Sequence, residues 1–381
     1  MAKKKEIVIE SPQSKKLAAI QAACAALQSK FGKESVNFLG NNKAEPIPRI
    51  PTGSIALDRI TGGGYPLGRI IELSGGPSSG KTTACYHAIA EAQKMFPDKW
   101  CGFVDSEYSA DLQYAENVGV NISELVVAQP DTGTDAFAMV QGMVEAGASL
   151  IVVDSVAAML PREESEEDDY GKASVGTQAR MMSKGLRKLT AIVGKHKCVI
   201  IFTNQLRDRV GIMFGDPSTT SGGKSLQYYA SIRLKFTRIG KIDEKNGDEK
   251  LVTAIETKAE AIKNKTYRPY LVDKFTVVFG KGIDNDAGVL DIAISEGIIQ
   301  KKGGWYAIDG NNVAQGLVNL KAYLEENTSV YESIKQKVKE AVKPETDDEQ
   351  SINDTSIDAD SMTDDEIANQ IAAEETESGE V

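Results

Sequence analysis

The sequence predicts an α/β protein built on a mostly parallel, twisted sheet with helices on both faces. Short apolar runs that lack polar alternation recur along the chain, and segments with helical periodicity separate them. Strands of this kind are buried on both faces, as happens when helical crossovers connect parallel strands. The chain has 381 residues, of which 41% are hydrophobic and 26% charged, so it is long enough for two to three domains of a soluble globular protein.

The expected elements begin with an amphipathic helix over residues 13–31, followed by a segment rich in Gly and Pro at 34–69. The helix carries its apolar residues at helical spacing, at Leu17, Ile20, Cys24 and Leu27. The alternating part of the chain comes next. Its expected strands lie at 70–73, 102–105, 125–128, 150–154 and 198–203, and its expected helices at 82–95, 135–146 and 176–193.

The pattern changes after residue 228. Residues 228–279 read as longer alternating strands, which predicts an antiparallel extension of the sheet. Residues 283–343 return to short strands and helices and predict a small α+β domain. We therefore divide the chain into an N-terminal helix and arm, an α/β core, a C-terminal domain and a tail, at 1–44, 45–282, 283–343 and 344–381.

The net charge of −11 is concentrated in the tail. Residues 346–381 contain thirteen acidic residues and no Lys or Arg, so residues 1–345 carry a net charge of +2. The tail also lacks aromatic residues and cannot bury enough apolar surface to offset the entropy of ordering, so we expect it to be disordered. A solubilising role and a regulatory role both remain open for it.

Composition excludes several classes of protein. No uncharged apolar run reaches the roughly 18 residues that a membrane span needs, and no apolar stretch near residue 1 resembles a secretory signal. The four cysteines are far apart and the chain has two histidines, which argues against a zinc cluster, a disulfide framework and a histidine-based triad. We therefore expect a protein of the reducing cytoplasm.

A phosphate-binding motif follows the first apolar strand. Residues 75–82 fit GxxxxGK[ST] and lie between a predicted strand and a predicted helix, which is the context that the motif requires. Backbone N–H groups there can face phosphates, while Lys81 neutralises the β- and γ-phosphates and Thr82 ligates Mg²⁺. An ordinary Gly-rich turn is the weaker alternative. The predicted nucleotide contacts are Gly75, Gly76, Pro77, Ser78, Ser79, Gly80, Lys81, Thr82 and Thr83.

Two acidic residues follow other predicted strands. Asp154 ends the apolar run at 150–154, where it can hold the water shell of a metal ion. Glu107 comes just after the strand at 102–105, where a carboxylate can orient and deprotonate an attacking water. Taken alone, Asp154 could be a helix cap or turn residue and Glu107 a solvated loop acid.

A basic surface is predicted from residues 171–207, which contain eight Lys and Arg residues and no acid. Four of them recur at spacings of 0, 4, 7 and 8 and therefore share one helix face: Arg180, Lys184, Arg187 and Lys188. Contact with nucleic-acid phosphates is favoured over a merely solvated face. Residues 206–223 read as a long structureless loop that begins directly after Asn204 and Gln205, where a side chain can sense the γ-phosphate.

These residues resemble the RecA family of bacterial and phage homologous-recombination proteins over about residues 13–341. The matching segments occur in order: SSGKTT at 78–83, VVDSVAA at 152–158, ARMMS at 179–183, NQ at 204–205, GIMFG at 211–215 and KNK at 263–265. The acidic tail also resembles that of the family. The resemblance implies a RecA-like P-loop ATPase core with an N-terminal helix–strand arm and a small α+β C-terminal domain.

The resemblance assigns roles to residues of the ATP site. Lys81 and Glu107 match catalytic residues, and Gln205 matches the glutamine that links the γ-phosphate to a DNA-binding loop. Asp111 and Tyr114 match residues that bind and stack on adenine. Lys263 and Lys265 match lysines that reach the ATP of a neighbouring subunit, and Thr82 and Asp154 match the metal-binding pair.

The resemblance also assigns the DNA-binding residues, Arg180, Ser183, Arg187, Arg207, Arg209, Val210, Gly222 and Gly223. Residues 13–40 match the arm that packs on the adjacent protomer of a filament. Some positions depart from the family: Pro77 replaces a common acid, and Tyr228 replaces an interface phenylalanine. In the C-terminal domain Ser295, Gly297 and Leu317 stand where lysines are common, which predicts weaker recruitment of duplex DNA and leaves Lys301 and Lys302 as candidates.

The resemblance therefore implies an ATP- and Mg²⁺-dependent recombinase that forms helical filaments on single-stranded DNA and exchanges strands with homologous double-stranded DNA. A self-cleaving repressor of the SOS response and recombination mediators are candidate partners. Two other functions stay open from the residues alone. One is a ring-shaped P-loop motor such as a hexameric helicase, and the other is a nucleotide-gated DNA-coating protein whose hydrolysis is incidental.

Overall fold

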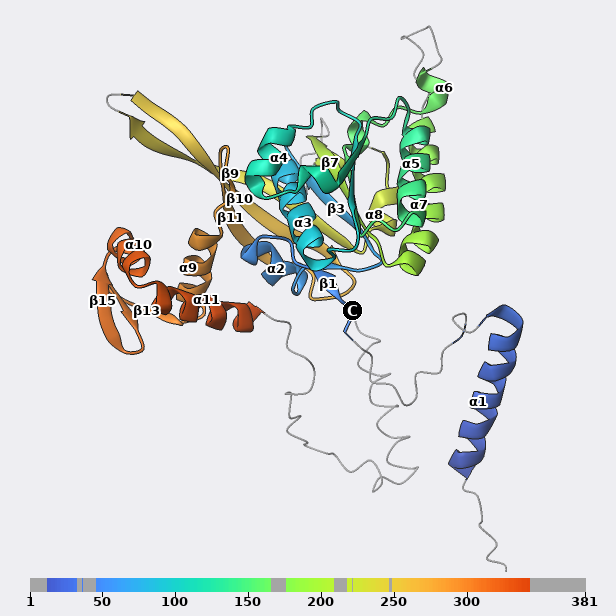
Figure 1. The fold of residues 1–381 in the computed structure, drawn as a ribbon, viewed down its shortest axis with the longest axis horizontal. Coiled ribbons are helices and arrows are strands. Elements are labelled where there is room, and N and C mark those ends of the chain that lie inside the picture. The colour runs from blue at the N-terminus through green and yellow to red at the C-terminus, as the bar shows by residue number, and fades with distance from the viewer. Residues whose placement is uncertain are drawn as a thin grey trace, which may run out of the picture.

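A computed structural model describes residues 12–32, 36, 46–165, 176–208, 218–220, 222–246 and 249–342. Within them, a large twisted sheet forms the centre of the α/β part, and a smaller domain lies to one side (Figure 1). The predicted disorder of the tail concerns residues outside the described ones. The predicted domain boundaries stay predictions.

The large sheet has ten strands among the described residues, in the order β12-β11-β10-β9-β3-β7-β6-β4-β5, with β8 paired to β7. The strands that pair in parallel are β3 (Ile70–Gly75), β4 (Cys101–Asp105), β5 (Leu125–Ala128), β6 (Leu150–Asp154), β7 (Val199–Asp208) and β9 (Ile232–Asn246). The antiparallel extension consists of β10 (Glu249–Asn264), β11 (Val272–Val278) and β12 (Gly282–Ile283). The prediction of a parallel sheet with an antiparallel extension is confirmed, and the β9–β10 hairpin projects beyond the sheet (Figure 1).

Helices cover both faces of the sheet, as predicted. One face packs on α2 (Ile55–Thr61), α3 (Lys81–Met95) and α4 (Leu112–Val118), and the other on α5 (Gly133–Glu145), α7 (Thr177–His196) and α8 (Ser225–Tyr229). Successive strand residues alternate between the two cores, so that Ile200 belongs to one core and Ile201 to the other. Both cores are needed because the central strands β3, β4 and β6 are buried along their whole length.

Shorter elements complete this part of the fold. They are β1 (Arg49–Ile50), β2 (Tyr65–Pro66), the 3₁₀ turns at Ile122–Glu124 and Val156–Ala158, α6 (Arg162–Ser165) and β8 (Ser218–Thr220). The segment 34–69, predicted only as rich in Gly and Pro, thus contains α2. Ser54 caps the N-terminus of this helix by accepting a hydrogen bond from the Leu57 N–H, and Gly62 ends it with φ of 81°.

The prediction of a structureless loop over 206–223 is wrong at its ends. Strand β7 continues to Asp208, and Leu206 to Asp208 pair with Ser218 to Thr220 of β8. The two threonines of β8 favour strand pairing, and a single sequence does not reveal a partner ten or more residues away. Arg209 and Val210 lie outside the described residues.

The C-terminal domain has its own core. It comprises α9 (Asn285–Ser295), β13 (Ile299–Lys302), β14 (Trp305–Ile308), β15 (Asn311–Gln315), α10 (Leu317–Glu326) and α11 (Thr328–Val342). The prediction of a small α+β domain is confirmed. Hydrogen bonds hold its start against the α/β part, because Asn285 Nδ2 donates to Gly53 O at 2.7 Å and, in the preceding β12, the Ile283 N–H donates to His87 Nε2 at 2.8 Å.

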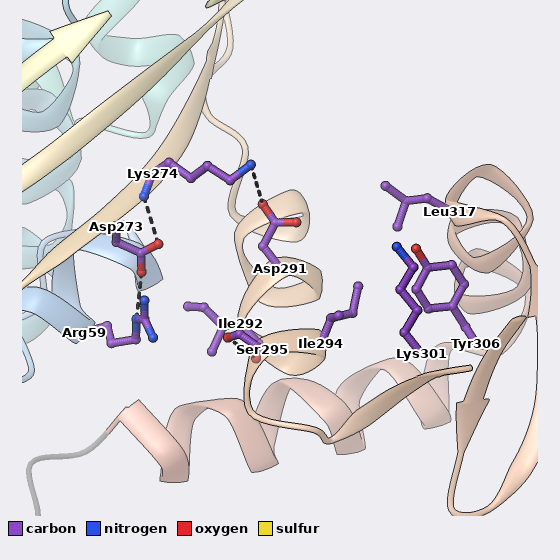
Figure 2. Close-up of a pocket in the computed structure, with 10 residues that line it drawn as sticks. All are labelled: Arg59, Asp273, Lys274, Asp291, Ile292, Ile294, Ser295, Lys301, Tyr306 and Leu317. Carbon is purple, nitrogen blue, oxygen red and sulfur yellow. Dashed lines mark hydrogen bonds and ion pairs between the residues drawn. The ribbon is translucent and has the colours of Figure 1, made fainter. Parts of the chain in front are cut away.

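Charged pairs join the core to this domain around a pocket of about 350 Å³ (Figure 2). Arg59 lies 2.8 Å from Asp273 and 3.5 Å from Glu296, while Lys274 lies 3.7 Å from Asp291. On the far side of the pocket the Lys301 ammonium lies 5.9 Å from the centre of the Tyr306 ring (Figure 2). Leu317, one of the positions without the family's lysine, lines the same pocket.

Helix α1 (Pro12–Phe31) is the predicted N-terminal helix. Its large apolar side chains are exposed, including Leu17, Leu27 and Phe31, the last with 62% of its surface accessible. Since an amphipathic helix is stabilised mainly by burying its apolar face, this one needs a surface to cover it. Among the residues that the structure describes, no helix is both long enough and apolar enough to cross a bilayer.

Candidate nucleotide-binding site

The carboxyl ends of four neighbouring parallel strands form one edge of the sheet. In the order β3-β7-β6-β4, Gly75 pairs with Gln205 and Asp105 pairs with Asp154. Ligands of open α/β sheets bind outside these strand ends. The register therefore brings the glycine-rich motif, Gln205, Asp154 and the segment after β4 to the same crevice.

The glycine-rich loop is shaped by its backbone. Ser78 has φ of 52° and Gly80 has φ of 87°, both in the left-handed region. A Cβ on Gly75 would lie 2.6 Å from the carbonyl oxygen of Phe236, so only glycine fits between β3 and β9 there. The Lys81 ammonium donates to Gly75 O at 3.1 Å and Gly76 O at 2.9 Å. Burial lowers the pKa of Lys81, and the carboxylates of Asp154 and Glu107 oppose this shift.

The predicted metal-binding pair is in contact. The Thr82 hydroxyl donates to Asp154 Oδ2 at 2.8 Å, and the Thr203 hydroxyl donates to Oδ1 of the same carboxylate. Burial raises the pKa of Asp154, while the hydrogen bonds from Thr203 and Thr82 oppose this shift. The strand end thus holds a hydroxyl and a carboxylate oxygen side by side.

Glu107 lies within the same crevice. Its Oε1 accepts a hydrogen bond from the Ser155 hydroxyl and another from Gln205 Nε2, the latter at 3.0 Å. The preceding loop is fixed by Asp105, which accepts from the Ser109 and Ala110 N–H groups at 3.2 and 3.1 Å. The structure therefore brings together Lys81, Thr82, Asp154, Glu107 and Gln205, which sequence reasoning placed in one site.

Ser155 was missed by sequence reasoning as a site residue. The available signal was its position directly after Asp154 at the end of an apolar strand, in the middle of a motif that matches the family. Its role depends on reaching Glu107, which lies 48 residues earlier in the chain.

The residues present fit a nucleoside triphosphate with Mg²⁺. Thr82 and Asp154 offer the hard oxygen donors that Mg²⁺ prefers. Gly76 has open space where a Cβ would be, so the backbone can approach a phosphate closely. The buried Ser106 hydroxyl, next to Glu107, has no hydrogen-bond partner among the described protein atoms, which provides one further polar group for a ligand or its water.

A pocket of about 400 Å³ adjoins the loop and is suited to a base. Ser78, Gly80, Thr83, Asp111 and Tyr114 line it, together with Val277 and Phe279. The hydroxyl groups of Tyr114 and Thr83 are 3.0 Å apart. Asp111 also caps α4, because its Oδ1 accepts from the Tyr114 N–H at 2.9 Å.

Two predicted catalytic lysines lie elsewhere. Lys263 pairs across the sheet with Arg233 of β9, which in turn pairs with Glu72, three residues before Gly75. The Lys263 ammonium donates to the carbonyl oxygens of Gln227 and Tyr228 at 2.6 and 3.0 Å. Burial, followed by the charges of Lys265 and Arg233, lowers the pKa of Lys263 to about 8. Lys265 follows β10 and donates its N–H to Ser231 O at 2.9 Å.

The predicted basic stripe lies on the exposed side of α7. Its members, Arg180, Lys184, Arg187 and Lys188, are all exposed, and Ser183 between them is partly buried. Gly222 and Gly223 pack beside the start of this helix, since a Cβ on Gly223 would lie 3.0 Å from Ala179 Cβ. Arg207 is paired in β7 with Thr219 of β8, which places the backbone of the hairpin directly beyond Gln205.

Comparison with known proteins identifies the family. A model described as the RecA N-terminal domain matches residues 18–284, and one described as the RecA C-terminal domain matches residues 287–343. Protein RecA of Marinobacter nauticus is 44% identical over 328 residues, which cover 86% of this chain and 92% of that protein. Protein RecA of Acinetobacter baumannii is 44% identical over 324 residues, or 84% and 91%, and that of Bordetella avium is 42% identical over 330 residues, or 86% and 92%.

Among solved structures, a RadB recombinase is 22% identical with a TM-score of 0.45 and covers 61% of this chain and 98% of its own. The two RecA models together span most of the chain, and the relatives match it along nearly their whole length. The chain therefore belongs to the RecA family.

Proposed function

We propose that the crevice at the ends of β3, β4, β6 and β7 binds ATP with Mg²⁺ and hydrolyses it in response to DNA. The chain is a recombinase that acts in homologous recombination and DNA repair, with the nucleotide binding, DNA binding and filament formation of its family. The observation that carries the proposal for this site is the contact of Glu107 with both Ser155 and Gln205, beside the Thr82–Asp154 pair.

Each residue of the crevice has a part in hydrolysis. Lys81 and the loop N–H groups bind the β- and γ-phosphates, and Thr82 and Asp154 hold Mg²⁺, which supplies positive charge to those phosphates. Glu107 accepts a proton from water as the water oxygen bonds to the γ-phosphorus and the bond to the β–γ bridging oxygen breaks. Ser155 positions the Glu107 carboxylate. Tyr114 and Asp111 bind the adenine base at the adjoining pocket.

Gln205 connects this chemistry to DNA. Its amide contacts Glu107, and its backbone leads directly into the β7–β8 hairpin. DNA phosphates bind the stripe on α7 and the neighbouring loops through Arg180, Ser183, Arg187, Arg207, Arg209, Gly222 and Gly223, and the aliphatic side chain of Val210 inserts between bases. A change in the conformation of the hairpin can therefore change the position of Glu107, the carboxylate that activates water.

Filament growth uses the surfaces left uncovered in one protomer. The exposed apolar residues of α1 pack on the adjacent protomer, which buries the face that this helix cannot cover itself. Lys263 and Lys265 reach the ATP of that neighbour. We also infer a cytoplasmic location, because the four cysteines are free thiols. A self-cleaving repressor and recombination mediators are the further partners that we propose.

The test is an ATPase assay with and without single-stranded DNA. Turnover should rise when DNA is added and fall as salt increases, and Lys81→Ala should abolish it. Lys94→Ala is the matched control, because Lys94 lies on the same helix in an exposed pair with Glu91. Electron microscopy should show open filaments with ATP, whereas closed rings would favour a helicase-like motor. Identical assembly with ATP, with ADP and without nucleotide would contradict the proposal.

A further inference from the structure

A row of polar side chains crosses the middle of the large sheet. The register pairs Lys263 of β10 with Arg233 of β9, and Arg233 with Glu72 of β3. Residues paired across adjacent strands share one face of a sheet. Asn204 of β7 extends the row, because its side chain reaches Glu72 from the other side.

Glu72 is the centre of this row. It is fully buried, and both of its carboxylate oxygens have partners: Oε1 accepts from Asn204 Nδ2 at 3.0 Å, and Oε2 accepts from Arg233 Nε. The Arg233 side chain is 14% exposed. An ion pair therefore occupies a position between strands where apolar residues fill the rest of the two cores.

Stability alone does not account for this pair. Removing two charges from water costs about as much as their attraction returns, and well-packed apolar replacements of a buried ion pair are often neutral or stabilising. What the pair does provide is a fixed position for its neighbours. Glu72 anchors the side chain of Asn204, so it fixes the backbone of β7 next to Gln205.

The two ends of the row lie at functional positions. Asn204 is followed directly by Gln205, whose amide contacts Glu107 at 3.0 Å. At the other end, Lys263 is directly opposite Arg233 and donates hydrogen bonds to the carbonyl oxygens of Gln227 and Tyr228 in α8. A shift of the Lys263 ammonium changes the electrostatic balance around Arg233, and Arg233 shares its partner Glu72 with Asn204.

We propose that Glu72 and Arg233 are positioning residues that couple Lys263 to Gln205. This inference rests on the proposed function, in which Lys263 engages the ATP of a neighbouring protomer. When Lys263 does so, Arg233, Glu72 and Asn204 transmit the change across the sheet to Gln205 in the protomer's own site. One ATP site of a filament is thereby coupled to the next through the interior of a subunit.

The experiment compares ATP turnover on single-stranded DNA across a range of ATP concentrations. The wild-type protein should show a sigmoidal dependence, since coupled sites act cooperatively. Glu72→Gln leaves Arg233 buried without a counter-charge, so it should lower both the thermal midpoint and the cooperativity. The double variant Glu72→Leu/Arg233→Met separates the effect on cooperativity from the effect on stability, because it replaces the ion pair with apolar side chains of similar size.

The double variant should recover the thermal midpoint but not the sigmoidal dependence, and its half-saturating ATP without DNA should stay at the wild-type value. Ser74→Ala is the matched control. Ser74 lies two residues from Glu72 on the same strand and face and is paired in register with Asn204, and its buried hydroxyl donates to Leu234 O of β9 at 3.2 Å. This control should keep the sigmoidal dependence.

Three outcomes would overturn the proposed coupling of Lys263 to Gln205. They are a double variant as cooperative as the wild type, a Ser74→Ala variant that loses cooperativity equally, and a wild-type protein that DNA stimulates but whose ATP dependence is hyperbolic. In each of these the proposed function survives. Failure of DNA to stimulate the wild-type ATPase at all is the different result that would overturn the proposed function itself.

Discussion

Protonation of His87 should loosen the contact between α3 and β12, the last strand before the C-terminal domain. The Nε2 atom accepts a hydrogen bond from the Ile283 N–H at 2.8 Å, so this nitrogen must be unprotonated. Two glycines pack against this residue, because a Cβ on Gly282 would lie 2.6 Å from Nε2 and one on Gly53 would lie 2.7 Å from the Cβ of His87. Burial lowers the pKa of His87 from 6.5 to about 4, while the charge of Glu91 raises it and that of Lys94 lowers it by smaller amounts.

The sign and size of the effect follow from this shift. Above pH 6.5 the imidazole is neutral in both the folded and the unfolded chain, so it has no effect on the pH dependence. Between pH 6.5 and 4 the unfolded chain binds a proton that the folded chain rejects, and stability falls as pH falls. The loss amounts to about 2 kcal/mol at pH 5 and about 3 kcal/mol at pH 4.

Urea unfolding at pH 7 and pH 5 measures this effect when the wild-type protein is compared with His87→Gln. Glutamine places an amide oxygen near the position of Nε2 and does not titrate. The comparison is needed because Asp58, whose pKa is raised to about 6 mainly by burial, changes stability in the opposite direction over the same pH range. Asp58 is present in both proteins and cancels. An equal change in unfolding free energy for both proteins between pH 7 and pH 5 would refute the assignment.

Four further predictions concern function. Glu107→Gln should reduce DNA-stimulated turnover by about two to four orders of magnitude while ATP-dependent DNA binding survives, as seen by filter binding; equal loss of both would contradict a role in activating water. Ser155→Ala should lower turnover about tenfold at unchanged half-saturating ATP, whereas Ser155→Thr, which keeps the hydroxyl, should retain most activity. Arg187→Ala should weaken binding to single-stranded DNA and reduce the slope of log affinity against log salt by about one, and an unchanged slope would indicate a merely solvated residue. Deleting residues 346–381, with their thirteen acids, should strengthen duplex binding at low salt more than at high salt; equal binding at both would leave the tail only a solubilising role.

Much of the fold could be predicted because its strands are buried on both faces. The run Leu150 to Asp154 has no polar alternation, and the predicted helix at 82–95 differs from α3 by one residue at its start. The pairing of β7 with β8 could not be predicted, since it depends on the path of the residues between them. Helix α2 was missed because its seven residues are too few to establish a period.

The residues of the site also fall into a group that could be predicted from the sequence and a group that could not. Residues that face a ligand along their own strand or loop, such as Lys81 and Asp154, carry a local signature of sequence and spacing. The row that supports them has none, because Glu72 meets Asn204 132 positions away and Arg233 161 positions away. In a single sequence, a charged residue within an apolar run is evidence against a buried strand. The register of four strands shows that Glu72 is the centre of a connected set of side chains. Because this set links two ATP sites, replacing Glu72 should reduce cooperativity between sites rather than catalysis within one site.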